Sequence, residues 1–163
     1  MKELKVSIDI RPRAWQSVKA SIPNDKNKTV RFRKRKVKLV FRKPKWVEAY
    51  KSKIIYQIRS KAGPVKLIGK IRVISLIYNY KTARKKLHGE YKETHPDLMD
   101  NMNKPLFDAL TKGGFIEDDR YIVESLLTRK VWGDVNRIDL HLQEIEGTSQ
   151  IKGEIYPGEP GLP

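Results

Sequence analysis

Cysteine is absent from this 163-residue chain, and histidine occurs only at His88, His95 and His141. The lack of cysteine excludes disulfide bonds, thiolate chemistry and cysteine-ligated zinc, and it suits a reducing cytoplasm. No two of the histidines lie at the spacing of a metal-binding pair, so a histidine-rich zinc site is not expected. The candidate chemistry therefore has to come from other side chains.

Long apolar runs are missing as well. The sequence contains no stretch of about 18 apolar residues, the length that a membrane helix needs, and no hydrophobic signal segment follows Met1. The chain is therefore expected to be soluble, to remain in the cytoplasm and to have no membrane partner.

Acidic residues are in a clear minority. The chain has 19 Asp and Glu against 35 Lys and Arg, which gives a formal net charge of +16. So large an excess of cations is typical of a protein that binds a polyanion. Since no membrane-binding segment is evident, the sequence favours nucleic acid as that polyanion.

The length fits one domain, long enough to bury roughly 70% of the surface that the unfolded chain exposes. The order of elements predicts a single small α+β domain over residues 1–145, with a mixed sheet of about five strands and two main helices. Residues 146–163 are rich in Gly and Pro. We expect them to form a flexible C-terminal tail without a packing face.

Apolar residues alternate with polar ones along residues 3–10, which predicts a half-buried strand. Residues 65–80 are rich in β-branched and aromatic side chains and predict a long strand, with Gly69 at a bulge. Two further strands are predicted over 121–130 and 135–143, joined by a turn at 132–134. In the last strand, one face carries Ile138, Leu140 and Leu142.

Helical spacing appears after Pro44, where apolar residues recur at intervals of three and four. These residues are Val47, Tyr50, Ile54 and Ile58. The pattern predicts an amphipathic helix of about four turns that ends at Gly63 and Pro64.

Eleven Lys or Arg and no acid occur between Lys26 and Lys45. A block of like charge is often only solvated or disordered. Interleaved aromatic and β-branched residues favour instead a basic strand or hairpin that faces phosphates. A second basic loop follows residue 80. The candidate DNA contacts, which would neutralise phosphates without reading sequence, are Arg11, Arg13, Arg31, Arg33, Lys34, Arg35, Lys36, Lys85 and Lys86.

Acidic residues gather between His95 and Arg120 in spite of the basic surroundings. They are Asp97, Asp100, Asp108, Glu117, Asp118 and Asp119. A divalent cation such as Mg²⁺ takes oxygen ligands and is usually held by one or two carboxylates together with substrate phosphates. An EF-hand calcium loop is excluded, because a loop that starts at Asp97 places Met99 at its third position and Asp108 where a bidentate Glu is needed.

On a helical projection of this segment, one stripe carries Leu98, Met99, Met102, Leu106 and Leu110, and the opposite face carries Asp97, Asp100, Asn101, Lys104 and Asp108. Pro105 requires the helix to begin within residues 100–104, with Asp97 in the preceding loop. Gly113 and Gly114 end it. The alternative is an ordinary amphipathic helix whose polar face is only solvated. Carboxylates at 97 and 100 repel each other, however, unless a cation or Lys104 compensates.

The acidic segment resembles the RusA-type Holliday-junction resolvases, or crossover junction endodeoxyribonucleases, a family of small phage and prophage enzymes. Their pattern is roughly D-x-D-N-x-x-K, then D-A-L, a short turn with glycine, and D-D before a strand. The matching residues here are Asp100, Asn101 and Lys104, then Asp108, Ala109 and Leu110, then Asp118 and Asp119. Residues 11–13 (Arg-Pro-Arg) also resemble the family's opening, and the order of elements agrees over most of residues 3–145.

One position departs from the pattern. The first acid, Asp97, lies three residues before Asp100, where the family usually has a separation of two.

The resemblance implies a RusA-like fold and a Mg²⁺-dependent homodimer, with Mn²⁺ as a substitute, that resolves four-way DNA junctions during recombination and repair. It further implies that Asp97, Asp100 and Asp119 ligate the metal, and that Lys104 is a catalytic residue near the scissile phosphate. Asp118 is an alternative ligand, an orienter or a turn residue, and Asp108 is expected to support the helix. Two other functions remain open: a non-catalytic nucleic-acid-binding protein, and a related nuclease that prefers flaps, forks or RNA.

Overall fold

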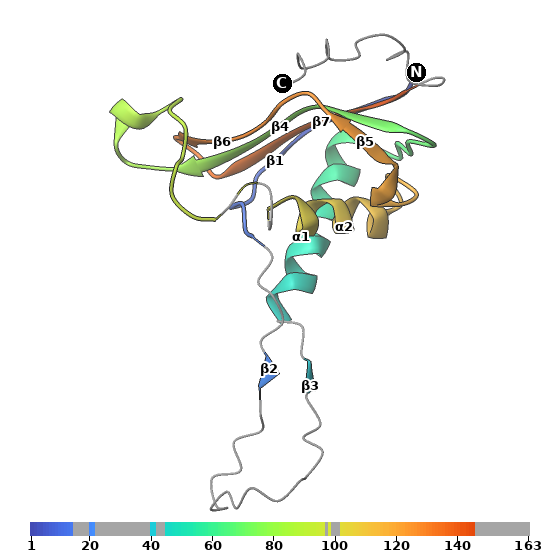
Figure 1. Ribbon diagram of the computed structural model, residues 1–163, viewed down its shortest axis with the longest axis horizontal. Coiled ribbons are helices and arrows are strands. Elements are labelled where there is room, and N and C mark those ends of the chain that lie inside the picture. Colours follow the sequence, from blue (N-terminus) through green and yellow to red (C-terminus); the bar gives the residue numbers. More distant parts are fainter. Residues whose placement is uncertain (15–19, 22–39, 42–44, 97, 99–101, 146–163) are drawn as a thin grey trace, which may run out of the picture.

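The computed structural model describes residues 1–14, 20–21, 40–41, 45–96, 98 and 102–145, and it shows a five-stranded sheet with two helices packed on one of its faces (Figure 1). The strands of the sheet are β1 (Glu3–Ile8), β4 (Ile71–Lys81), β5 (Ile122–Ser125), β6 (Thr128–Gly133) and β7 (Arg137–Glu144). The helices are α1 (Lys45–Ala62) and α2 (Asn103–Gly113). The predicted α+β fold, with a mixed five-stranded sheet and two main helices, is confirmed.

The strand order brings several chain segments to one edge of the sheet. The order is β1-β7-β4-β5, and β6 pairs with β4 beyond β5. β7 is antiparallel to both β1 and β4, while β5 and β6 are parallel to β4. β1, β4 and β6 therefore run in the same direction, so the segments that follow these three strands leave the sheet at the same edge.

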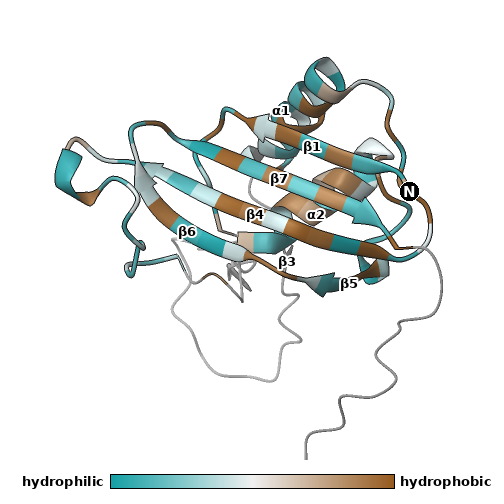
Figure 2. Ribbon diagram, turned by 90° about the horizontal axis from the view of Figure 1, so that it is seen from above, coloured by the Kyte–Doolittle hydropathy of each residue, from teal (hydrophilic) through white to brown (hydrophobic). Residues whose placement is uncertain are grey.

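The core lies between the helix-bearing face of the sheet and the two helices. The predicted apolar positions of β1 and β7 are all buried, as are those of α1, and the alternation along the strands is visible in Figure 2. From α2, the buried residues are Pro105, Leu106, Ala109 and Leu110. The periodicities of two and 3.6 residues thus identified the buried faces correctly.

A bulge in β4 changes which of its residues face the core. The pairing with β7 shifts register between Val73 and Ser75, so Val73 and then Leu76 are buried. A bulge was expected at Gly69, but Gly69 lies in the turn before the strand, with φ +75°. The predicted start of this strand at residue 65 was therefore wrong, because the chain turns at Gly69 and pairs only from Ile71 onward.

The segment predicted as one strand over 121–130 is two strands, β5 and β6. They are separated at Leu126 and Leu127, whose backbone groups bond to β4 on either side of its bulge: Leu126 N donates to Val73 O and Leu127 O accepts from Leu76 N. The turn after β6 was expected at 132–134, but Trp132 and Gly133 belong to the strand. The interruption lies opposite the bulge of β4, because β5 pairs with β4 before the bulge and β6 pairs with it after the bulge.

The ends of α2 agree with the predicted signals. The helix starts at Asn103, so Pro105 lies in its first turn, where the missing N–H removes no helical hydrogen bond. Gly114 ends it in the left-handed region, with φ 76°. Of the predicted apolar stripe, Met102, Leu106 and Leu110 are buried and Leu98 packs against the core, while Met99 lies outside the described residues.

Of the basic block over residues 26–45, the structure describes only residues 40–41 and Lys45. β2 (Ala20–Ser21) pairs antiparallel with β3 (Val40–Phe41), as a hairpin requires. The candidate DNA contacts Arg31, Arg33, Lys34, Arg35 and Lys36 lie between these strands, outside the described residues, as does the tail from residue 146 onward. No helix in the described part of the chain is long and apolar enough to cross a membrane.

Replacing Ile54→Ala should lower the free energy of unfolding by about 2–5 kcal/mol, because the side chain is fully buried between α1 and the sheet. Tyr56→Ala is the matched control on the same helix. Tyr56 is 72% exposed, so its loss should change stability by no more than about 0.5 kcal/mol. Urea unfolding measures both, and equal losses would contradict the packing of α1.

Candidate functional site

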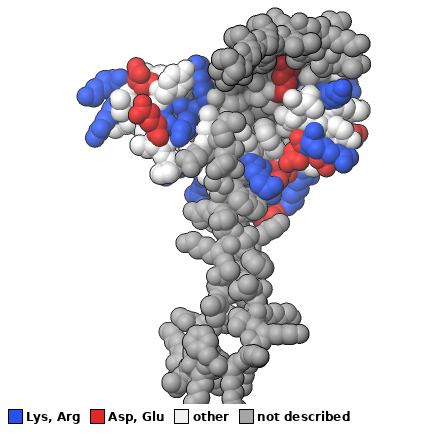
Figure 3. Space-filling model, in the orientation of Figure 1, with Lys and Arg blue, Asp and Glu red and all other residues white. Residues whose placement is uncertain are grey.

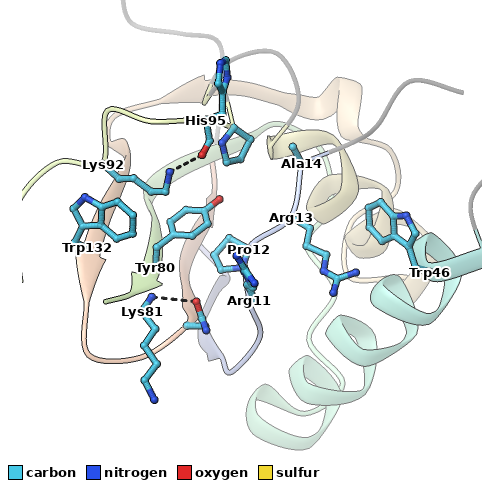
Figure 4. A pocket seen from close by; sticks show the side chains of 12 residues that line it. Arg11, Pro12, Arg13, Ala14, Trp46, Tyr80, Lys81, Lys92, His95 and Trp132 are labelled. Atoms are coloured by element: carbon cyan, nitrogen blue, oxygen red, sulfur yellow. Dashed lines mark hydrogen bonds between the residues drawn. The ribbon is translucent and has the colours of Figure 1, made fainter. Parts of the chain in front are cut away.

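A cavity of about 870 Å³ opens at the sheet edge where β1, β4 and β6 end (Figure 4). The segment after β1 supplies one wall, the first turn of α1 another, and the ends of β4 and β6 a third. Its lining residues are Arg11, Pro12, Arg13, Ala14, Trp46, Tyr80, Lys81, Lys92, His95, Pro96, Trp132 and Asn136. The parallel direction of the three strands thus brings distant parts of the sequence to one depression.

The cavity is cationic and aromatic. Arg11, Arg13 and Lys81 are exposed at its margin, and none of the lining residues in the described part of the chain is acidic. The Arg13 guanidinium lies 5.3 Å from the centre of the Trp46 ring, and its backbone N–H donates to the Tyr50 hydroxyl. Burial raises the pKa of Tyr50 to about 12, so this hydroxyl stays protonated at neutral pH.

Lys92 forms the floor of the cavity. Its ammonium lies 4.9 Å from the centres of both the Tyr80 and Trp132 rings, and its Nζ donates to Thr94 O at 2.8 Å and to His95 O. Only 5% of the residue is exposed, and this burial lowers its pKa, with nearby Lys130 and Arg11 acting in the same direction. The Lys92 ammonium therefore binds backbone carbonyl groups within the protein.

Lys130 holds the same segment from β6. Its Nζ donates to Thr94 O at 2.9 Å and to Pro96 O at 2.7 Å. The neighbouring residue in the parallel pairing is Tyr78 of β4. The buried Tyr78 hydroxyl lies 3.2 Å from Met102 O and 2.9 Å from Asn103 Oδ1, at the start of α2.

Tyr78 and Lys130 consequently fasten both ends of the short segment from residue 97 to residue 101. Burial raises the pKa of Tyr78 well above its usual value, so the hydroxyl remains protonated and can donate. The predicted site residues Asp97, Asp100 and Asn101 belong to this segment and lie outside the described residues. Its two ends, however, are held beside the cationic cavity.

The other predicted site residues lie on and after α2. Lys104 is exposed in the first turn, and its Nζ is 3.9 Å from Asp108 Oδ1. Asp108 Oδ2 is 2.7 Å from Nζ of Lys51, a buried residue of α1. This ion pair joins the two helices, which fits the supporting role expected of Asp108.

The adjacent acids Asp118 and Asp119 differ in their contacts. Asp118 Oδ1 accepts from the backbone N–H of Arg120 at 2.9 Å and so caps the short helix η3 (Asp119–Tyr121). Asp119 is exposed, and η3 packs against α2. Its carboxylate is a hard oxygen donor of the kind that Mg²⁺ takes. The described residues contain no cluster of three or more His, Asp or Glu side chains at metal-binding distance.

Of the predicted DNA contacts in the described part, Arg11 and Arg13 line the cavity. Lys85 and Lys86 are exposed in the short helix η1 (Lys85–Leu87), which follows β4. Figure 3 shows Lys and Arg side chains at this end of the molecule, with acidic side chains among them, and a second mixed group of charges at the opposite end.

Sequence reasoning missed the aromatic part of the cavity. The sequence patterns gave no functional role to Trp46, Tyr80 or Lys92, and they placed Trp132 in a turn. A signal existed for Tyr80, which lies at the end of an apolar strand, but β6 with the sequence TRKVWG gave none for Trp132. Only the parallel pairing of β4 with β6, however, makes them neighbours.

Together, the fold and the site define a class: a small α+β protein with a cationic and aromatic cavity lined in part by Pro96, at the start of the acidic segment, and suited to a phosphate-bearing polymer. A family model described as Endodeoxyribonuclease RusA matches residues 22–143. The chain belongs to this RusA endodeoxyribonuclease family. No match was found among curated proteins.

Replacing Lys92→Met should reduce the free energy of unfolding by about 1–3 kcal/mol, because the carbonyl groups that its ammonium binds lose a donor. Lys53→Met provides the control, since Lys53 is exposed on α1, and it should be close to neutral. Chemical unfolding compares them. If the Lys92 variant is as stable as the parent protein, the hydrogen bonds of Lys92 do not stabilise the fold.

Proposed function

We propose that this protein is a Mg²⁺-dependent endonuclease that resolves four-way DNA junctions by paired phosphodiester hydrolysis. Family membership supports nuclease chemistry. The observation that carries the proposal is that Tyr78 and Lys130, partners in adjacent strands, hold the two ends of the acidic segment beside a cationic cavity. The metal site and the phosphate-binding surface would then lie next to each other.

In the proposed site, Asp97, Asp100 and Asp119 hold the metal, and Asp118 either orients Asp119 or serves as an alternative ligand. Mg²⁺, or Mn²⁺ in its place, would neutralise non-bridging phosphate oxygens and lower the pKa of an attacking water. Lys104 is exposed at the start of α2, where its ammonium can approach the scissile phosphate. No protein nucleophile is required.

The cations around the site would position the DNA backbone. Arg11 and Arg13 lie at the cavity and Lys85 and Lys86 lie in η1, which leaves the same edge of the sheet. The basic block with Arg31, Arg33, Lys34, Arg35 and Lys36 extends this set in the proposal. Contacts of this kind give salt-sensitive binding that is largely independent of sequence.

A homodimer would supply two such sites related by twofold symmetry. Resolving a four-way junction requires paired cuts on strands of the same polarity, which a twofold arrangement of active sites provides. The proposed place of action is the cytoplasm of a bacterial host, where a phage or prophage enzyme would meet recombining DNA.

Incubated with a synthetic four-way junction and Mg²⁺, the protein should release paired nicked duplexes, because both sites act on one junction. EDTA should abolish cutting by removing the metal. Denaturing gel electrophoresis of labelled strands detects the nicks, and a linear duplex of the same sequence is the control. An intact junction at high enzyme and metal concentrations would reject nuclease activity in favour of a binding protein, while preferred cutting of flaps or forks would favour a related nuclease.

Asp119→Asn should lower the cutting rate by more than about a hundredfold, since residues that only support a metal ligand are worth about 10- to 100-fold. Junction affinity, measured by fluorescence anisotropy in EDTA, should stay unchanged. Asp134→Asn makes the same chemical change at an exposed position and should cut normally. If the Asp119 variant retains cutting, Asp119 is not a ligand.

A further inference from the structure

The aromatic walls of the cavity have no part in the proposed metal chemistry. Trp46 comes from the first turn of α1 and Trp132 from the end of β6, and they face the cavity from opposite sides (Figure 4). Both indoles pack against the core yet stay partly exposed. Two indoles on one surface depression indicate a ligand with a flat apolar part.

The size of the cavity limits that ligand. About 870 Å³ lies within the range of roughly 300–1,000 Å³ found for pockets that take small organic molecules. A nucleotide is of this size class, whereas a base pair within a duplex would have to leave its helix to enter. The cavity therefore suits an unpaired nucleotide of a strand.

The charges define the rest of the ligand. Arg11, Arg13 and Lys81 place cations at the margin of the cavity, where a phosphate of a strand would pass. Lys92 beneath them is already engaged with the carbonyl groups of Thr94 and His95 and keeps the floor rigid. A margin of cations around aromatic walls is the arrangement that binds single-stranded nucleic acid, through the backbone and by base stacking.

We propose that this cavity binds one unpaired nucleotide of the DNA strand, with its base against Trp46 or Trp132 and its phosphate against Arg11 and Arg13. The proposal rests on the proposed function only in taking DNA as the substrate. Because Pro96 both lines the cavity and accepts from Lys130, the bound nucleotide would adjoin the acidic segment. Uptake of an unpaired base would then favour branched DNA over continuous duplex.

The test uses two fluorescent probes and the full chain in EDTA, so that no cutting can occur. One probe is an eight-residue abasic strand, and the other carries a single thymine at its centre. The thymine should raise affinity about tenfold, since stacking of one base on an aromatic side chain is worth several-fold or more. Equal affinity for the two probes would show that the cavity takes phosphate alone and would overturn the proposal.

Variants locate the effect. A double variant with Trp46→Leu and Trp132→Leu should bind both probes with equal affinity. Tyr56→Leu and Tyr91→Leu, which remove exposed aromatic side chains outside the cavity lining, should retain the preference for the base. A retained preference in the double tryptophan variant would overturn the location, and the comparison of probes on the parent protein holds even if that variant fails to fold.

The two proposals fail separately. If the parent protein cuts junctions but binds both probes equally, the nucleotide cavity is rejected and the proposed nuclease activity stands. A base preference in a protein that cuts no junction would reject the nuclease and keep the cavity.

Discussion

The arrangement of the site depends on hydrogen bonds from two strands to the backbone between residues 92 and 103. Lys130 of β6 holds Thr94 and Pro96, and Tyr78 of β4 holds the start of α2. The bonds to Met102 O and Pro96 O are buried or partly buried, so these carbonyl groups would carry a desolvation cost if they lost their donors. Because Tyr78 and Lys130 are register partners, the pairing of β4 with β6 decides where the acidic segment begins and ends.

The excess of positive charge serves two physically different purposes. Lys51, Lys92 and Lys130 are buried or partly buried and bind carboxylate or carbonyl oxygens within the protein. Arg11, Arg13, Lys81, Lys85 and Lys86 are exposed and lie at the ends of β1 and β4 or after them, and these two strands run in the same direction. Of these two groups, only the second is exposed to an external anion, so net charge alone overstates the number of cations that a ligand could reach. The lowered pKa of Lys92 reflects the cost of burying its positive charge.

The direction of the strands also explains why residues far apart in sequence share a cavity. β7 lies between β1 and β4 and is antiparallel to both, so β1 and β4 are parallel to each other. The carboxyl ends of β1, β4 and β6 therefore meet at one edge, and the first turn of α1 closes the cavity there through Trp46. The helices cover one face of the sheet, and the cavity lies at the edge where β1, β4 and β6 end (Figure 1).

From the sequence alone, local patterns determined the class of fold, the buried faces of β1, β7 and α1, and the start and end of α2, because these depend on periodicity, Pro105 and Gly114. The spacing of Asp100, Asn101 and Lys104 also led to the correct family. Tertiary structure alone decided the bulge in β4, the division into β5 and β6, and the cavity between Trp46 and Trp132. These features arise from pairing between distant strands, whose register and direction no local pattern encodes.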